Sequence, residues 1–140
     1  FQRAMGMALT DNSLWLATQY QLWRFENALS KGERHGEHDR VFVPQLAYAT
    51  GDLDVHDVAI DKDGEPVFVA TAFNCIATVS QTHSFRPLWK PPWISEIVGE
   101  DRCHLNGLAL KHGRPAYATA VSKSDVVDGW RARRKGADVR

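Results

Sequence analysis

Two short polar segments carry the residue types that can do chemistry in this chain. His56 and Asp57 stand in one segment, and His104 and Asn106 stand in the other. Imidazole and carboxylate groups are ligands for Zn²⁺ and other divalent ions, and an imidazole beside a carboxylate can act as a general base. These residue types therefore indicate a metal site or a proton-transfer site, provided that the fold brings the two segments together.

The metal hypothesis uses His56, His104 and Asn106 as ligands of a divalent ion, and the wider ligand-binding hypothesis adds Asp57 to the same set. No catalytic residue can be assigned from the pattern, so an enzymatic role stays open. A divalent metal ion is the one cofactor that these residues indicate.

Asp54 and Asp101 stand just before the two histidine segments. They are placed to act as second-shell acceptors that orient the imidazole rings. The competing hypothesis is structural. Histidine and aspartate near the start of a strand often bond backbone groups of a neighbouring element and hold the fold together.

Other charged clusters are better explained as solvated surface. His35 and His38 stand in a polar loop over residues 30–40, whose glycines argue against the helix that would align the two rings. The basic cluster near the C-terminus has no interleaved aromatic residues, so we expect surface rather than a nucleic-acid site. Its members are Arg131, Arg133, Arg134 and Lys135.

Three copies of one pattern must position the polar segments. Each copy has an alanine followed by Leu or Ile, then a polar turn, then an apolar strand that ends in Ala-Thr. The anchoring residues Ala8, Ala59 and Ala109 are spaced by 51 and 50 residues. A repeat of roughly 40–50 residues built from short strands is typical of propeller blades. Each blade is a small sheet that buries its faces against its neighbours.

The pattern predicts an all-β chain, a propeller-type repeat of about three four-stranded antiparallel blades that form a partial propeller. A single domain over 1–140 would contain blades at about 5–50, 56–98 and 104–140. First strands are expected at 7–9, 58–60 and 108–110, and second strands at 14–18, 67–71 and 116–119. Third strands are expected at 21–25 and 75–79, and fourth strands at 41–46 and 85–89.

The first strand of each blade lines the central channel of a propeller, which would place both histidine segments near one channel mouth. An unrelated β-sandwich with chance internal similarity is the alternative fold. Beyond the third copy, Ser124 is a candidate cap for a short helix that begins at Asp125, although Gly129 weakens that helix. An extended insert on one rim of the propeller is the equal alternative for this segment.

Composition narrows the class of function. The chain has 17 basic and 17 acidic residues, and a formal net charge of zero gives no long-range field toward nucleic acid or an acidic membrane. Cys75 and Cys103 are too few for a disulfide framework and are expected as buried free thiols. We find no targeting segment and no apolar run long enough to cross a bilayer, which favours a cytoplasmic location.

Four segments, at 14–27, 51–57, 100–109 and 119–131, resemble a bacterial family of hypothetical proteins with a propeller-like domain of unknown function. The resemblance implies further blades after residue 140 and implies no activity. The Asn-Gly-Leu-Ala run at 106–109 is similar to one in the gluconolactonase and senescence-marker-protein propellers. That weaker likeness implies that Asn106 helps to hold a divalent metal near the channel.

These observations favour a propeller scaffold that binds a ligand or a partner protein at its channel mouth. The alternative is a metal-dependent hydrolase or lyase with a His/Asp/Asn site in the same place. A purely structural association module is a third hypothesis. Self-association to complete the ring is expected if no further blades follow, because a partial ring leaves blade faces and strand edges exposed.

Overall fold

The computed structural model describes residues 1–133 and shows an all-β chain. The strands in this range form three antiparallel sheets of four, four and two strands. Residues 1–133 contain no α-helix, and their two helical turns, Thr71–Phe73 and Arg131–Arg133, are of the 3-10 type. No sheet closes on itself within this range.

Each sheet follows the chain order, so within a sheet every strand after the first pairs with the strand before it. The first sheet contains β1 (Met7–Leu9), β2 (Ser13–Ala17), β3 (Gln21–Asn27) and β4 (Phe42–Ala49). The second contains β5 (Val55–Ile60), β6 (Pro66–Ala70), β7 (Cys75–Thr78) and β8 (Arg86–Trp89). The third contains β9 (Leu105–Lys111) and β10 (Arg114–Ala120). Each of the ten strands overlaps one that the sequence predicts.

The second sheet is the centre of the core, and β6 is buried along its whole length. Successive side chains of a strand point to opposite faces. Phe68 accordingly packs with Trp15 and Leu22 of the first sheet, whereas Val67 and Val69 pack with Leu105 of the third. A strand buried on both faces is expected to be continuously apolar, which explains the run from 67 to 70.

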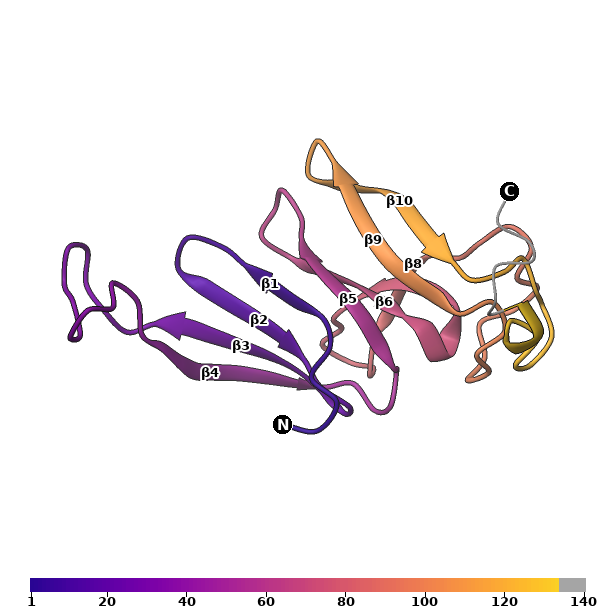
Figure 1. Ribbon diagram of the computed structural model, residues 1–140, viewed down its shortest axis with the longest axis horizontal. Helices are drawn as coiled ribbons and strands as arrows, with labels where there is room; N and C mark the ends of the chain where they lie inside the picture. The colour runs from indigo at the N-terminus through magenta and orange to yellow at the C-terminus, as the bar shows by residue number, and fades with distance from the viewer. Residues whose placement is uncertain (134–140) are drawn as a thin grey trace.

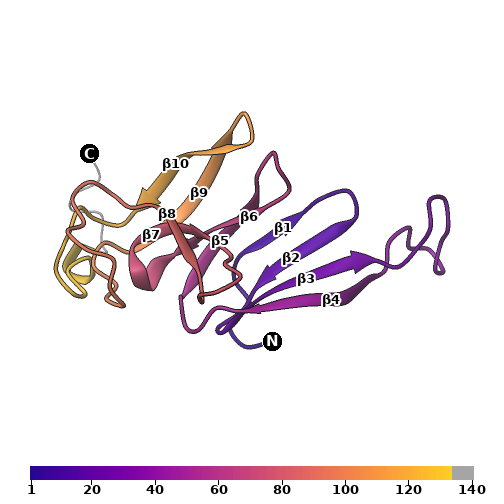
Figure 2. The same cartoon turned by 180° about the vertical axis from the view of Figure 1, so that it is seen from behind.

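The first strands of the three sheets lie side by side, in the order β1, β5, β9, as both ribbon views show (Figures 1 and 2). The chain enters each sheet through a non-glycine residue with positive φ: Arg3 at 48°, Asp54 at 50° and His104 at 51°. Each stands five residues before Ala8, Ala59 or Ala109. A left-handed conformation costs an ordinary residue roughly 1–2 kcal/mol, so its recurrence at one place reflects a shared way of entering the sheet.

Close backbone approaches join the sheets. A Cβ atom at Gly6 would lie 2.8 Å from Val58 Cγ2 and 3.0 Å from the carbonyl carbon of Asp57, so only glycine fits there. At the next boundary, the Lys62 N–H donates to the Gly113 carbonyl at 2.9 Å. The sheets therefore pack with their first strands almost in backbone contact.

The third sheet contains two strands within residues 104–133, and these are the two strands that the sequence predicts there. After β10 the chain turns back across the start of β9. The Val121 and Ser122 N–H groups both donate to the Cys103 carbonyl, at 3.1 and 3.3 Å. The segment after β10 is thereby held against the β8–β9 connection, where it cannot pair with β10.

Of the two alternatives for the segment after β10, a short helix from Asp125 or an extended insert, the helix is not formed within residues 1–133. Residues 127–130 form turns, and the single helical turn that follows is Arg131–Arg133. Ser124 Oγ accepts the Val126 N–H at 3.2 Å, but Asp128 then adopts a left-handed φ of 55°. A left-handed residue ends the right-handed α-helical path.

Candidate functional site

His56 and His104 meet at the boundary between the second and third sheets. Their ring centroids are 4.9 Å apart, and their planes cross at 82°. His56 is the second residue of β5, and His104 immediately precedes β9. Their side chains are 14% and 16% exposed, so the pair is largely enclosed and still reachable from solvent.

His104 is held on two sides. Asp101 Oδ2 lies 2.6 Å from His104 Nδ1, and Asp101 Oδ1 accepts the His104 backbone N–H at 2.9 Å. The buried indole of Trp130 stacks on the imidazole, with centroids 4.0 Å apart and planes at 24°. This ring therefore has a fixed position and a fixed orientation.

His56 is held by its Nδ1 atom, which lies 2.8 Å from the Asp54 carbonyl and 3.0 Å from Thr71 Oγ1. The Thr71 hydroxyl donates its hydrogen to the Leu105 carbonyl at 2.6 Å, which leaves its oxygen as an acceptor. Thr71 thus links the ring to the first residue of β9.

These partners determine the tautomer of both rings. Asp101 as a carboxylate, the Asp54 carbonyl and the occupied Thr71 oxygen can only accept. Each neutral imidazole therefore carries its hydrogen on Nδ1 and has a lone pair on Nε2, as assigned from the hydrogen-bond network. Neither Nε2 has a hydrogen-bond partner within residues 1–133.

Asp57 and Asn106 are placed differently from the histidines. Asp57 accepts the Val58 N–H through Oδ1 at 2.9 Å and the Leu108 N–H through Oδ2 at 2.8 Å. It thus joins the second sheet to the third through the backbone, which is the structural role set out as the competing hypothesis. Asn106 is exposed on β9, two residues beyond His104.

A network of ion pairs around Arg102 holds the segment that carries Trp130, which forms one side of the histidine site. The Arg102 guanidinium contacts Glu96, Glu100 and Asp125 at 3.1, 2.7 and 2.9 Å, and its side chain is 9% exposed. These carboxylates raise the Arg102 pKa further above its already high value. Hydrogen bonds from Ser95 and then from Arg102 lower the pKa of Asp125. Through Asp125, the network fixes the segment that carries Trp130.

One comparison with known proteins bears on this chain. The family model described as a domain of unknown function (DUF4915) matches residues 1–139. The chain belongs to the DUF4915 family. Neither the curated proteins nor the solved structures give a match.

The other candidate sites in this DUF4915 chain have fewer groups that could bind a ligand or a metal ion. Within residues 1–133, no group of three or more His, Cys, Asp or Glu side chains is arranged to hold a metal ion. His35 and His38 pair through their backbones in the exposed loop, as expected for a solvated segment. A hollow between β8 and β10 is lined by Trp89, Leu108 and Tyr117 among others, and none of its lining residues is charged.

The cysteines of this DUF4915 chain are buried free thiols, as predicted. Burial raises the pKa of Cys75 to about 12 and is the main cause that raises the pKa of Cys103 to about 11. Thiols that stay protonated are poor nucleophiles. In residues 1–133, no helix has the length and apolar character needed to cross a membrane.

Sequence reasoning placed Asp101 and Asp54 beside the histidines but missed Thr71 and Trp130. Thr71 ends the Ala-Thr run of the second copy, and its polarity at the end of an apolar strand was the available signal. Trp130 is buried, and it also forms one face of the histidine site.

Proposed function

We propose that this chain is a propeller-type scaffold that binds a small ligand at the His56–His104 pair. Three observations support the propeller-type architecture. Successive antiparallel sheets pack face to face, their first strands lie side by side, and each sheet begins after a left-handed residue five positions before its anchoring alanine. The histidines then lie at one end of the first strands, where a propeller opens its channel.

A single observation carries the binding role. Two imidazoles from successive sheets touch, and the acceptors behind them direct both Nε2 lone pairs away from the backbone partners. Within residues 1–133, each ring makes its internal hydrogen bonds through Nδ1, so Nε2 is available to a ligand. Two fixed acceptors beside an aromatic wall suit a ligand that offers a hydrogen-bond donor or a Lewis acid.

The test is an NMR study of the isotope-labelled 140-residue chain. Long-range ¹H–¹⁵N spectra should show the Nδ1–H tautomer for both histidines. Fragments with N–H or O–H donors should shift the His56, His104 and Trp130 signals more than those of Trp89 and Tyr117. An Nε2–H tautomer, or shifts confined to the β8–β10 hollow, would contradict the proposal.

A second candidate function is a metal-dependent hydrolase or lyase. The Asp101–His104 pair favours it, because a carboxylate bonded to Nδ1 orients an imidazole as a general base. Cleavage of chromogenic carboxylic and phosphate esters, with and without zinc chloride, tests this function. Activity that is absent in His104→Gln and present in His83→Gln would support it, and equal rates in both variants would reject it.

A further inference from the structure

We propose that His56 and His104 together bind a divalent transition-metal ion, with Zn²⁺ as the reference case, through their two Nε2 atoms. This inference rests on the proposed function, since it names the ligand class for the same pair of rings. The ion would bind the Nε2 lone pairs, which the hydrogen bonds within residues 1–133 do not use.

The groups behind the rings match the surroundings of metal-binding histidines. Such histidines nearly always donate the other ring N–H to a carboxylate, a backbone carbonyl or water. His104 has a carboxylate in that place, at 2.6 Å, and His56 has a carbonyl, at 2.8 Å. The Asp54 carboxylate also lies 3.8 Å from His56 Nδ1, so acidic groups stand behind both rings. A dication is therefore favoured over an anion at this place.

The spacing of the rings also fits a shared ion. With metal–nitrogen bonds of about 2.1 Å and near-tetrahedral angles, two imidazole centres on one ion lie roughly 5 Å apart. The observed separation is 4.9 Å. Thr71, Asp101 and Trp130 already hold the rings, so little side-chain entropy is lost when the ion binds.

The protein supplies two nitrogen ligands, and the remaining positions are open to water or to a further ligand. Imidazole suits Zn²⁺, Co²⁺, Ni²⁺ and Cu²⁺, whereas Mg²⁺ and Ca²⁺ prefer oxygen. A two-ligand site is weaker than a closed structural zinc site. We expect a dissociation constant in the micromolar range or weaker, and preference for Zn²⁺ over Mg²⁺.

The experiment is a calorimetric titration of the 140-residue chain with zinc chloride, paired with the long-range ¹H–¹⁵N spectra. The test variant is His56→Gln/His104→Gln. The matched control is His35→Gln/His38→Gln, which removes two histidines from an exposed loop. We expect one zinc ion per chain, loss of binding in the test variant, and binding by the control equal to that of the parent chain.

Two further readouts keep the outcomes distinct. In the parent chain, zinc should shift the Nε2 signals of His56 and His104, and this needs no variant to fold. Asp101→Asn should weaken zinc binding by roughly 10–100-fold if the carboxylate acts behind the ligand. Zinc binding that is lost only in the loop variant, or no zinc binding at all, would overturn the metal inference. If zinc does not bind but both histidines show the Nδ1–H tautomer, only the metal proposal is contradicted and the proposed ligand site still stands. An Nε2–H tautomer would contradict both the metal site and the ligand site.

Discussion

Asp57 Oδ2 accepts the backbone N–H of Leu108 at 2.8 Å, across the boundary between the second and third sheets. Its other oxygen accepts the Val58 N–H, so one carboxylate connects β5 to β9. Asp57 directly follows His56, and Leu108 is four residues beyond His104. The link therefore joins the two strands whose starts carry the histidine pair.

Replacing Asp57 with alanine should lower the free energy of unfolding by about 2 kcal/mol, because two backbone N–H groups lose an ionised acceptor. Urea unfolding followed by circular dichroism measures the change. Asp11→Ala, in an exposed turn, is the control and should change stability by less than about 0.5 kcal/mol. Equal effects in the two variants would show that the link between the sheets contributes nothing.

Gly6 should not tolerate alanine. The added Cβ would meet Val58 Cγ2 and the backbone of Asp57, which forces the first two sheets apart and should cost about 1–3 kcal/mol. Gly99→Ala is the matched control, because its Cβ would make an ordinary contact of 3.4 Å with Phe73. Thermal unfolding compares the two variants. A Gly6→Ala variant as stable as Gly99→Ala would mean that the sheets are less closely packed.

Arg102→Met should free the segment that carries Trp130, since the guanidinium ties that segment to the β8–β9 connection through Asp125. We expect a lower midpoint of thermal unfolding and a red shift of tryptophan emission as Trp130 leaves His104. Arg86→Met, at an exposed position of β8 away from Trp130, is the control. An unchanged emission maximum in Arg102→Met would contradict the role of the network.

Asp125→Asn should change how stability depends on acid pH. The folded chain lowers the pKa of Asp125, so its contribution to stability is present above the unfolded pKa of about 3.9. That contribution is lost as the pH falls through the lower folded pKa. The variant should be less stable than the parent chain at pH 6, and the difference should shrink as the pH falls below 4. A difference that stays constant over urea titrations at pH 6 to 3 would argue against this assignment.

Cys75 should make the fold sensitive to alkali. Burial raises its folded pKa from 9.0 to about 12, so between these values the unfolded thiol ionises while the folded one stays protonated. Stability is then full below pH 9 and falls by roughly 1.4 kcal/mol per pH unit above it. Urea unfolding at pH 7.5, 9 and 10.5 should show a shallower decline in Cys75→Ala. Equal slopes would place the alkaline sensitivity elsewhere.

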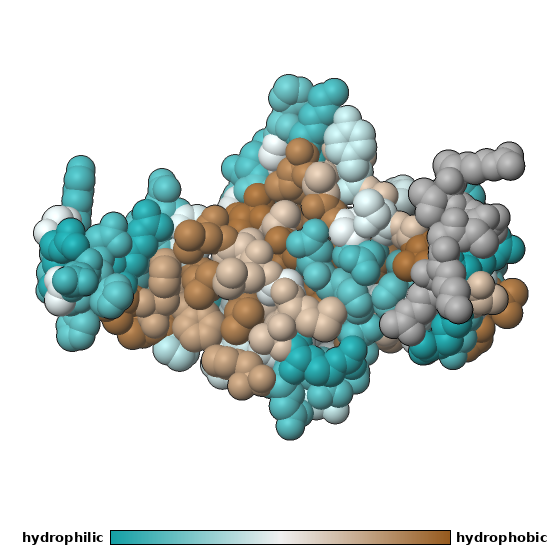
Figure 3. All heavy atoms as spheres, viewed as in Figure 1, coloured by the Kyte–Doolittle hydropathy of each residue, from teal (hydrophilic) through white to brown (hydrophobic). Residues whose placement is uncertain are grey.

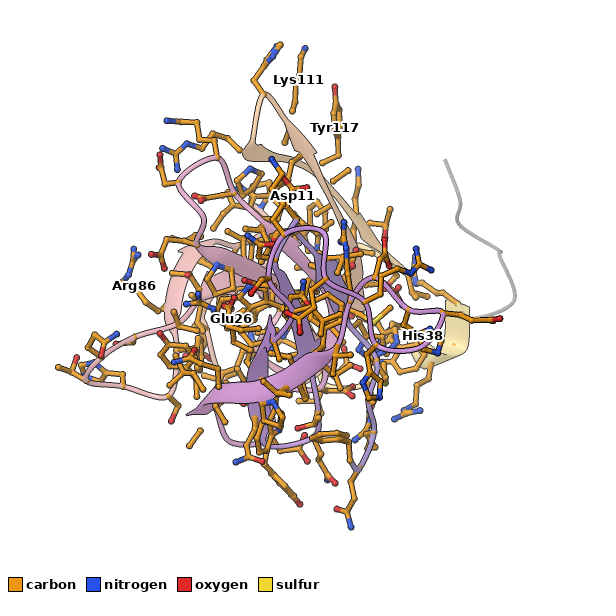
Figure 4. All side chains as sticks on the ribbon, turned by 90° about the vertical axis from the view of Figure 1, so that its left-hand side faces the viewer. Asp11, Glu26, His38, Arg86, Lys111 and Tyr117 are labelled. Atoms are coloured by element: carbon orange, nitrogen blue, oxygen red, sulfur yellow. The ribbon has the colours of Figure 1, made fainter. Side chains whose placement is uncertain are left out.

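The isolated 140-residue chain should self-associate. Met7 and Leu9 of β1 are 62% and 59% exposed, and apolar side chains gather over the middle of the face in Figure 3. Tyr117, with 63% exposure, projects with Lys111 from the far end of the β9–β10 hairpin (Figure 4). Exposed apolar sheet faces of this kind mark contact surfaces.

Light scattering tests this prediction. Met7→Lys/Leu9→Lys should shift the mass toward that of one chain, whereas Val126→Lys/Val127→Lys, on an exposed connection, should not. A monomeric parent chain at high concentration would contradict the prediction.

Much of the fold could be predicted from the sequence because its signals are local. Apolar alternation, turn residues such as Asp63-Gly64 and His112-Gly113, and the spacing of three alanines placed all ten strands. The path of the chain after β10 is set by contacts with residues that are distant in the sequence. It depends on the Arg102–Asp125 pair and on the Asp128 N–H, which donates to the Asp101 carbonyl at 3.0 Å.

The sequence by itself determined that His56, His104, Asp54 and Asp101 stand just before two first strands of an all-β chain. Only the tertiary structure decided that the two rings touch. His56 lies three residues before Ala59 and His104 lies five before Ala109, so alignment of the copies does not pair them. The left-handed backbone at His104 and the packing of β9 beside β5 bring the rings to 4.9 Å, because contacts between sheets, unlike strand periodicity, are not encoded in neighbouring residues.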